Sequence, residues 1–186
     1  VLKDKNLLKL VEQAKNYDSK AFGLLYEQFV SKVYNYIYYR TSNRDESEDL
    51  TAQTFVKALD AIGRFDGQKA SFLTWLIRIA NNLTIDYFRL KGRRIEVPLE
   101  HVREDCDFCD PEETALTNII SGRVKQLILG LIDEQRQVMI LKFNLHFTNS
   151  EIAKVMDKTE GSVKSLQHRA LSKIRKVLEE EDGLGT

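Results

Sequence analysis

The chain has 186 residues, of which 42% are hydrophobic and 30% are charged, and its formal net charge is zero. This length suffices for one ordinary domain or two small ones with modest cores. No apolar run approaches the roughly 20 residues that a membrane-spanning helix needs, and the charged, amphipathic first residues are unlike a signal peptide. We therefore expect a cytoplasmic protein without membrane insertion.

Charge is unevenly distributed along the chain. Residues 1–94 contain 16 Lys and Arg against 11 Asp and Glu, and residues 114–186 contain 11 against 9. Residues 95–113, between them, contain one Arg against 8 acidic residues. Two basic pieces therefore flank an acidic connector, and an asymmetry of this kind indicates a charged partner such as nucleic acid.

Apolar residues recur with the 3.6-residue period of helices, and few stretches alternate as strands do, so the sequence predicts an all-α fold. Helices are expected from about Leu7 to Ala14, from Phe22 to Ile37 and from Asp45 to Ala61. The acidic residues in the first turns of the third helix suit the helix dipole. Residues 64–70 are expected to form a loop, with Gly67 as its turn residue.

Residues 71–94 separate into two faces when they are placed at intervals of about 100°. The apolar arc consists of Phe72, Leu76, Ile79, Ala80, Leu83, Tyr87 and Leu90. The opposite edge carries Arg78, Asn82, Asp86, Arg89 and Arg93, with Trp75 beside it. This edge is either the solvated face of a core helix or a nucleic-acid face, where cations and an aromatic ring occur together.

Residues 95–113 lack periodicity, include Pro98 and Pro111 and are rich in acids, so we expect a flexible linker between two helical domains. The linker contains His101, Cys106 and Cys109, and the cysteines have the Cys-x-x-Cys spacing of zinc or redox sites. Tetrahedral zinc needs four ligands, and a thioredoxin-type motif needs a βαβ context. We therefore expect two reduced thiols without a metal, and a metal- or thiol-sensing switch is an alternative.

The C-terminal piece has the pattern of a helix-turn-helix. Thr148 and Glu151 have the spacing of a capping box, and after a short helix Asp157 can adopt a left-handed turn conformation. Thr159 can cap the next helix, whose apolar side is formed by Val163, Leu166, Ala170 and Ile174. Its outward side chains include Lys164, Ser165, His168 and Arg169, which can donate hydrogen bonds to base edges or phosphates. A solvated lysine-rich helix or a helix for a membrane surface is the alternative.

With these motifs in view, the sequence resembles the extracytoplasmic-function (ECF) group of bacterial sigma-70 factors. The stretch "SEDLTAQTFVKAL" resembles the family's polymerase-binding helix, and "FLTWLIRIANNLTIDYFR" resembles its promoter-melting and minus-ten-reading segment. The stretch "TNSEIAKVMDKTEGSVKSLQHRA" resembles its minus-thirty-five reader. The chain departs from the usual pattern at Thr54, where the family has an acid, at Leu166 for Arg, at Asp157 for Gly and at Ile132 for Pro.

The resemblance implies three sets of binding residues. Polymerase-binding residues would be Glu48, Asp49, Gln53, Phe55 and Lys57. Minus-ten residues would be the loop Phe65, Asp66, Gly67, Gln68 and Lys69, together with Asn82 at the pocket for a flipped base, Trp75, and Arg78, Arg89 and Arg93 along the DNA backbone. Minus-thirty-five residues would be Lys164, Ser165, His168 and Arg169.

The resemblance also implies a domain organisation and a function. Residues 1–94 would be a region 2-like domain, residues 95–113 the acidic linker and residues 114–186 a region 4-like helix-turn-helix domain. The protein would be a sigma factor with core RNA polymerase and promoter DNA as partners, and an anti-sigma factor is left open. No catalytic constellation stands out in the sequence, so we expect a protein that is not an enzyme and needs no cofactor. A stand-alone helix-turn-helix regulator is the alternative function.

Overall fold

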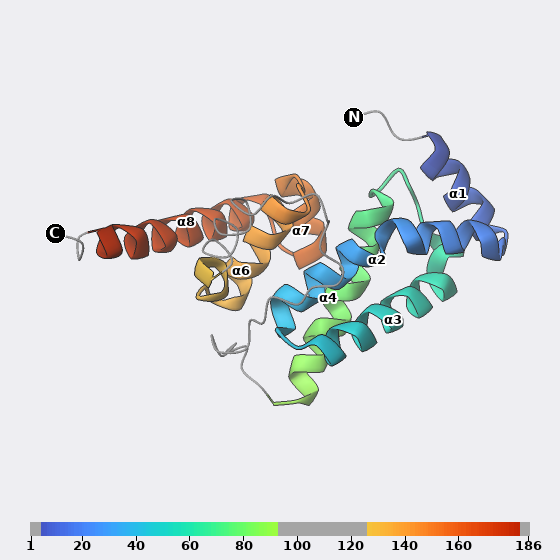
Figure 1. The fold of residues 1–186 in the computed structure, drawn as a ribbon. Helices are drawn as coiled ribbons and strands as arrows, with labels where there is room; N and C mark the ends of the chain where they lie inside the picture. The colour runs from blue at the N-terminus through green and yellow to red at the C-terminus, as the bar shows by residue number, and fades with distance from the viewer. Residues whose placement is uncertain (1–4, 93–125, 183–186) are drawn as a thin grey trace. The chain divides into compact units, whose positions relative to one another are not determined.

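The computed structural model describes residues 5–92 and 126–182, in which every regular element is a helix (Figure 1). The all-α prediction is thereby confirmed. The chain divides into two compact units, Val1–Gly92 and Arg93–Thr186, and each is described by itself. Among the described residues, none of the helices is both long and apolar enough to cross a membrane.

The first unit contains four α-helices and one short 3-10 helix in its described part. They are α1 (Lys5–Lys15), α2 (Ser19–Thr41), α3 (Arg44–Ala61), the 3-10 helix η1 (Ile62–Arg64) and α4 (Phe72–Leu90). Side-chain caps start three of them, because Asp18 accepts from the backbone N–H groups of α2, Asn43 from that of Glu46 and Ser71 from that of Thr74. These caps satisfy backbone donors that a helix leaves without partners at its N-terminus.

The core of the first unit lies between α2 and α4. Leu25 and Ile37 of α2 and Leu76 and Ile77 of α4 are completely buried. A polar cluster is buried with them, in which the Oδ1 atom of Asn81 accepts hydrogen bonds from Arg40 Nη1 at 2.7 Å and from the hydroxyl of Tyr36 at 3.2 Å. Arg40, Tyr36 and Asn81 are all less than 4% exposed, so these bonds form away from water.

The buried side of α4 only partly matches the predicted apolar arc. Phe72, Leu76, Ala80 and Leu83 are buried as expected, and Ile79 and Tyr87 are half-buried. Leu90 was expected in the core but is 85% exposed, because it ends the helix at a place that no described element covers. The buried side instead includes the polar residues Thr74, Asn81 and Thr84.

The second unit contains the predicted helix-turn-helix. Its described elements after the helical residues 126–129 are α6 (Asp133–Met139), a π-helical segment (Ile140–Asn144), α7 (Asn149–Met156) and α8 (Glu160–Asp182). The capping box of Thr148 and Glu151 is present, Asp157 is left-handed with φ 53°, and Thr159 accepts from Ser162 N–H at 3.2 Å. These predictions are confirmed.

The packing of the second unit also follows the sequence pattern. Val163, Leu166 and Ala170 are buried and Ile174 is half-buried, as predicted. Arg136, which is 2% exposed, donates from Nη2 to the carbonyls of Leu129 and Leu131 at 2.9 and 3.0 Å. This buried guanidinium therefore fixes the turn that precedes α6.

We predict that Asn81→Ala lowers the free energy of unfolding of the first unit by about 1–3 kcal/mol, because it removes a buried acceptor from two donors. The neighbouring Asn82 is exposed, so Asn82→Ala should change stability by less than about 0.5 kcal/mol. Urea unfolding followed by the fluorescence of Trp75, the single tryptophan of the chain, measures both. Equal losses for the two variants would contradict the assignment of Asn81 as the buried anchor.

Candidate nucleic-acid and partner interface

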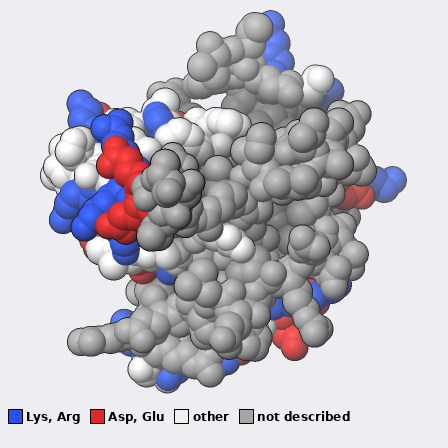
Figure 2. Space-filling model, turned by 60° about the vertical axis from the view of Figure 1, so that its left-hand side comes forward, with Lys and Arg blue, Asp and Glu red and all other residues white. Residues whose placement is uncertain are grey.

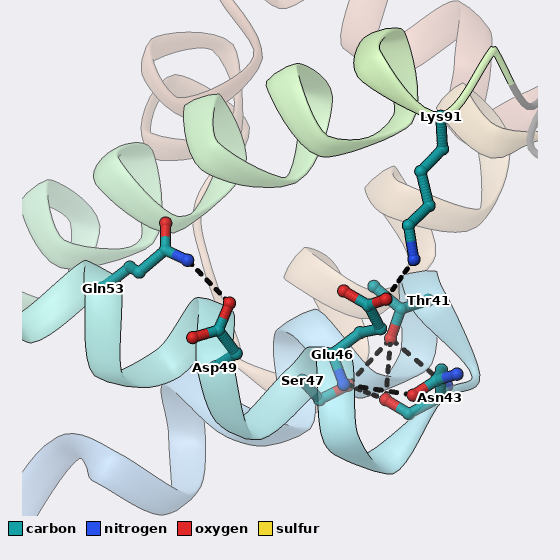
Figure 3. A network of polar contacts seen from close by, with 7 residues as sticks. All are labelled: Thr41, Asn43, Glu46, Ser47, Asp49, Gln53 and Lys91. Atoms are coloured by element: carbon teal, nitrogen blue, oxygen red, sulfur yellow. Dashed lines mark hydrogen bonds and ion pairs between the residues drawn. The ribbon is translucent and has the colours of Figure 1, made fainter.

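The outward face of α3 carries four of the five residues predicted to bind polymerase. Glu48, Asp49, Gln53 and Lys57 are all exposed. Gln53 Nε2 donates to Asp49 Oδ2 at 2.7 Å (Figure 3). Arg44 Nε pairs with Glu48 Oε1 at 2.9 Å. Both contacts span one helical turn, so they hold these side chains in place along the helix surface.

Phe55, the fifth predicted residue, does not lie on this face. It is 5% exposed, and its ring packs against Tyr26 of α2 with the ring centroids 4.7 Å apart. The prediction of a direct contact through Phe55 is therefore not matched by this structure, in which the ring is enclosed between helices. Val56, which is 61% exposed, instead lies on the outward side of α3, seven residues after Asp49. A spacing of two helical turns places Val56 on the same side of α3 as Asp49, and this could have been read from the sequence.

The start of α3 is tied to both neighbouring helices of its unit. Asn43 Oδ1 accepts from Glu46 N–H at 3.0 Å, and Ser47 Oγ lies 2.7 Å from Thr41 Oγ1 of α2 (Figure 3). Glu46 also pairs with Lys91, directly after α4. Hydrogen bonds to Glu46 and to Tyr87 raise the pKa of Lys91, which keeps its ammonium charged. These contacts hold the start of α3 against the end of α2 and against the residue that follows α4.

The predicted base-reading loop is anchored by aromatic rings. Phe65 is 6% exposed, and its ring centroid lies 5.4 Å from that of Phe72 and 5.2 Å from that of Trp75. It is therefore an anchor below the loop rather than a surface contact. Asp66, Gln68 and Lys69 remain exposed. The Asp66 carboxylate accepts from Gln68 N–H at 3.0 Å, and this bond, with the bond and charge of Lys69, lowers the pKa of Asp66.

The outward edge of α4 has the predicted polar character. Arg78, Asn82 and Arg89 are exposed, and Arg89 Nη2 pairs with Asp86 Oδ1 at 3.0 Å. Trp75, at the same end as the loop, is half-buried. Ile85, which is 46% exposed, lies between Asn82 and Arg89 and was not predicted. Arg93 lies outside the described residues.

The predicted minus-thirty-five residues come together on α8. Lys164, Ser165, His168 and Arg169 are exposed and line one open hollow at the surface. Arg169 Nε donates to the carbonyl of Ser165 at 3.3 Å. Gln167 Nε2 donates to Asn149 Oδ1 of α7 at 3.0 Å, which fixes α8 on the preceding helix.

The described surface carries both acidic and basic side chains. Among the described residues on the face drawn in Figure 2, acidic side chains lie directly beside basic ones. Attraction for DNA must therefore come from particular groups at particular places rather than from the whole molecule. Within residues 5–92 and 126–182 no three His, Cys, Asp or Glu side chains gather into a metal-binding group. His101, Cys106 and Cys109 lie outside these residues.

Comparisons with known proteins agree with this geometry. Residues 25–94 match sigma-70 region 2 and residues 127–176 match sigma-70 region 4, which defines the class of protein. The chain is 35% identical to the ECF RNA polymerase sigma factor BldN of Streptomyces coelicolor, with 94% of this chain and 67% of that protein covered. It is 31% identical to the ECF sigma factor SigW of Bacillus subtilis, with 91% and 95% covered.

Solved structures show the same fold. CnrH, determined in complex with the cytosolic domain of CnrY, superposes with a TM-score of 0.69 at 22% identity, over 95% of this chain and 99% of that one. The sigma factor RpoE of Bartonella quintana, in complex with the anti-sigma factor NepR, gives a TM-score of 0.68 at 22% identity, over 86% and 98%.

The chain therefore belongs to the ECF group of the sigma-70 family. It is a sigma factor for transcription initiation. The alternative of a stand-alone helix-turn-helix regulator is set aside, because the N-terminal unit matches a sigma region rather than a general dimerisation domain.

We predict that Phe55→Ala destabilises the first unit by about 3–5 kcal/mol, because it leaves a cavity between α2 and α3. Val56→Ala, one position along, should change the free energy of unfolding by less than about 0.5 kcal/mol, because its side chain is in water. Urea unfolding followed at Trp75 compares them. A Phe55→Ala protein as stable as Val56→Ala would show that the ring is not a core element.

Proposed function

We propose that three exposed faces of this sigma factor carry out separate steps of initiation in the cytoplasm. The α3 face binds core polymerase, the loop of residues 65–69 with the outward edge of α4 reads and opens the minus-ten element, and the first turns of α8 read the minus-thirty-five element. The protein does no covalent chemistry of its own in this scheme. The observation that supports it is that the polar residues matching each family motif are exposed together on one face.

The chemistry of the α3 face favours a protein partner over DNA. Glu48 and Asp49 are exposed and would repel phosphates. Gln53 adds an amide that can both donate and accept, and Val56 adds exposed apolar surface. A face with apolar and polar groups side by side is suited to a protein interface, in which an apolar centre is surrounded by hydrogen-bonding groups.

The minus-ten face combines groups for backbone and base contacts. Arg78 and Arg89 can neutralise phosphates, and these contacts would position the strand without reading its sequence. Asn82 lies between them on the exposed edge of α4, and its amide can donate to and accept from a base edge. Trp75 is half-buried and offers a ring near the loop on which an unpaired base can stack.

The first turns of α8 carry the groups that read a duplex. The N-terminal residues of the second helix in a helix-turn-helix contact base edges in the major groove. Lys164 and Arg169 can donate to guanine, and Ser165 and His168 can bind bases or phosphates. Gln167 is already bonded to Asn149, so it fixes the helix rather than reading DNA.

The proposal includes the remaining partners that the sequence suggested. The acidic segment 95–113 would connect the two units on the polymerase, since its charge disfavours contact with DNA. An anti-sigma factor also belongs to the proposal, because the structurally similar CnrH and RpoE were each solved with a protein partner, which for RpoE is an anti-sigma factor. Its identity is not assigned.

The double substitution Gln53→Ala with Lys57→Ala should weaken binding to core polymerase at least about tenfold, equivalent to roughly 1.4 kcal/mol. The control pair Gln28→Ala with Lys20→Ala removes the same two side-chain types from the exposed surface of α2 and should bind like the wild type. Fluorescence anisotropy of the labelled chain titrated with core polymerase measures both. Equal affinity of the two double variants would place the polymerase contact elsewhere.

Lys164→Ala and Arg169→Ala should each cost about 1–3 kcal/mol on the upstream element that the holoenzyme selects from random DNA. The loss on a scrambled element should be much smaller, because a base contact discriminates and a phosphate contact only attracts. Lys176→Ala, exposed near the other end of α8, is the matched control and should not change the ratio of the two affinities. Equal losses on both sequences would make α8 an electrostatic clamp without a reading role.

A further inference from the structure

Helix α1 has no role in the function described so far. It spans Lys5–Lys15 and lies before residues 25–94, which match sigma-70 region 2. Leu8, Val11 and Lys15 have helical spacings of three and four, so they lie on one side of α1. Val11 is 2% exposed, which shows that this side faces the body of the unit.

The same side of α1 contacts the loop of residues 65–69. Lys15 Nζ lies 5.8 Å from the centroid of the Phe65 ring, at a distance where a cation is attracted to an aromatic face. A Cβ atom added to Gly67 would lie 3.9 Å from Leu8 Cδ2 and 3.6 Å from Phe65 Cε1. Gly67, which is half-buried, therefore lies beside the Phe65 ring and the Leu8 side chain, which is 41% exposed. Figure 1 shows the loop beside α1.

Charge adds to this contact. Lys15 Nζ is held by Glu12 Oε1 at 2.8 Å, and the Lys15 side chain is 22% exposed. The pKa of Asp66 is lowered mainly by the hydrogen bond from Gln68 N–H and by Lys69, and the positive charge of Lys15 adds a smaller effect. The direct contact of Lys15 with the loop is with the ring of Phe65, and the ammonium adds a weaker attraction for the Asp66 carboxylate.

The loop is consequently held from two sides. Phe65 is anchored on the α4 side by Phe72 and Trp75, and on the other side the loop rests on Leu8 and Lys15. A binding site discriminates between ligands only when its hydrogen-bonding groups are fixed to within a fraction of an ångström, and loops without such support are mobile. The exposed groups of Asp66, Gln68 and Lys69 receive this support in part from α1.

We propose that α1 is part of the minus-ten reader, in which Leu8 and Lys15 are positioning residues that fix the loop of residues 65–69 and so determine its preference for one base. This inference rests on the proposed function of that loop and deepens it. Neither side chain needs to contact DNA. Their removal would loosen the loop, and the difference in affinity between the preferred base and the other three would shrink.

The experiment uses the full chain bound to core polymerase, with single-stranded DNA oligonucleotides randomised over the non-template minus-ten region as the probe. Selection with the wild-type holoenzyme identifies the position of strongest base preference, and affinities for all four bases there are then measured. Leu8→Ala and Lys15→Gln should each reduce that preference roughly five- to tenfold, because the discrimination of a well-placed base contact is of this order. Affinity for core polymerase should stay within about twofold, since the proposed α3 contacts are untouched.

Two further variants separate positioning from general stability. Lys15→Arg keeps the charge and the contact with the Phe65 ring, so it should restore the wild-type preference. Lys9→Gln removes the same charge from an exposed position on another side of α1 and should have no effect. A wild-type base preference in Leu8→Ala and Lys15→Gln would overturn the inference, as would an equal loss of affinity for all four bases. A wild-type holoenzyme without any base preference would instead overturn the minus-ten function, and the inference with it.

Discussion

The hydrogen bonds to Asn81 fix the rotation of α4 about its own axis, and the position of its exposed edge depends on that rotation. Arg40 and Tyr36 of α2 both donate to its Oδ1 atom inside the core, at 2.7 and 3.2 Å. A bond that has left water is costly to break, so α4 cannot rotate about its axis without leaving buried donors unsatisfied. Asn82 follows about 100° around the helix and is therefore held outward. Of these two adjacent asparagines, Asn81 therefore lies in the core and Asn82 lies on the exposed edge of α4.

The α3 face and the outward edge of α4, for which we propose polymerase and minus-ten contacts, belong to one compact unit. On the buried side of α3, Phe55 packs against Tyr26 of α2, so the backbone that carries the outward residues of α3 is supported by the core. The start of α3 is capped by Asn43 and paired through Glu46 with Lys91 after α4. Contacts made by α3 with a large partner therefore place α4 and its loop at the same time. This arrangement suits a sigma factor, which must position promoter DNA relative to the core polymerase that it binds.

The second unit, for which we propose the contact with the minus-thirty-five element, has a core of its own. Its two-helix motif depends on local devices: the capping box at Thr148, the left-handed Asp157 and the cap at Thr159. Asp can adopt the left-handed conformation at modest cost, so the usual glycine at this turn is dispensable here. Buried Arg136 fixes the turn before α6 through two carbonyls. The exposed face of α8 that carries Lys164 and Arg169 is therefore supported by bonds within its own unit.

The sequence by itself determined what depends on residues close along the chain. The helical class, the caps at Thr148 and Thr159, the turn at Asp157 and the buried side of α8 follow from spacing and from local hydrogen bonding, which act within a few residues. Burial at the remaining sites depends on which helix lies opposite, and only the tertiary structure decided it. Phe55 and Phe65 proved to be anchors because α2 and α4 cover them, and Leu90 proved to be exposed because no described element does. The contact of α1 with the loop also joins Lys15 to Phe65, 50 positions later in the chain, which no local pattern encodes.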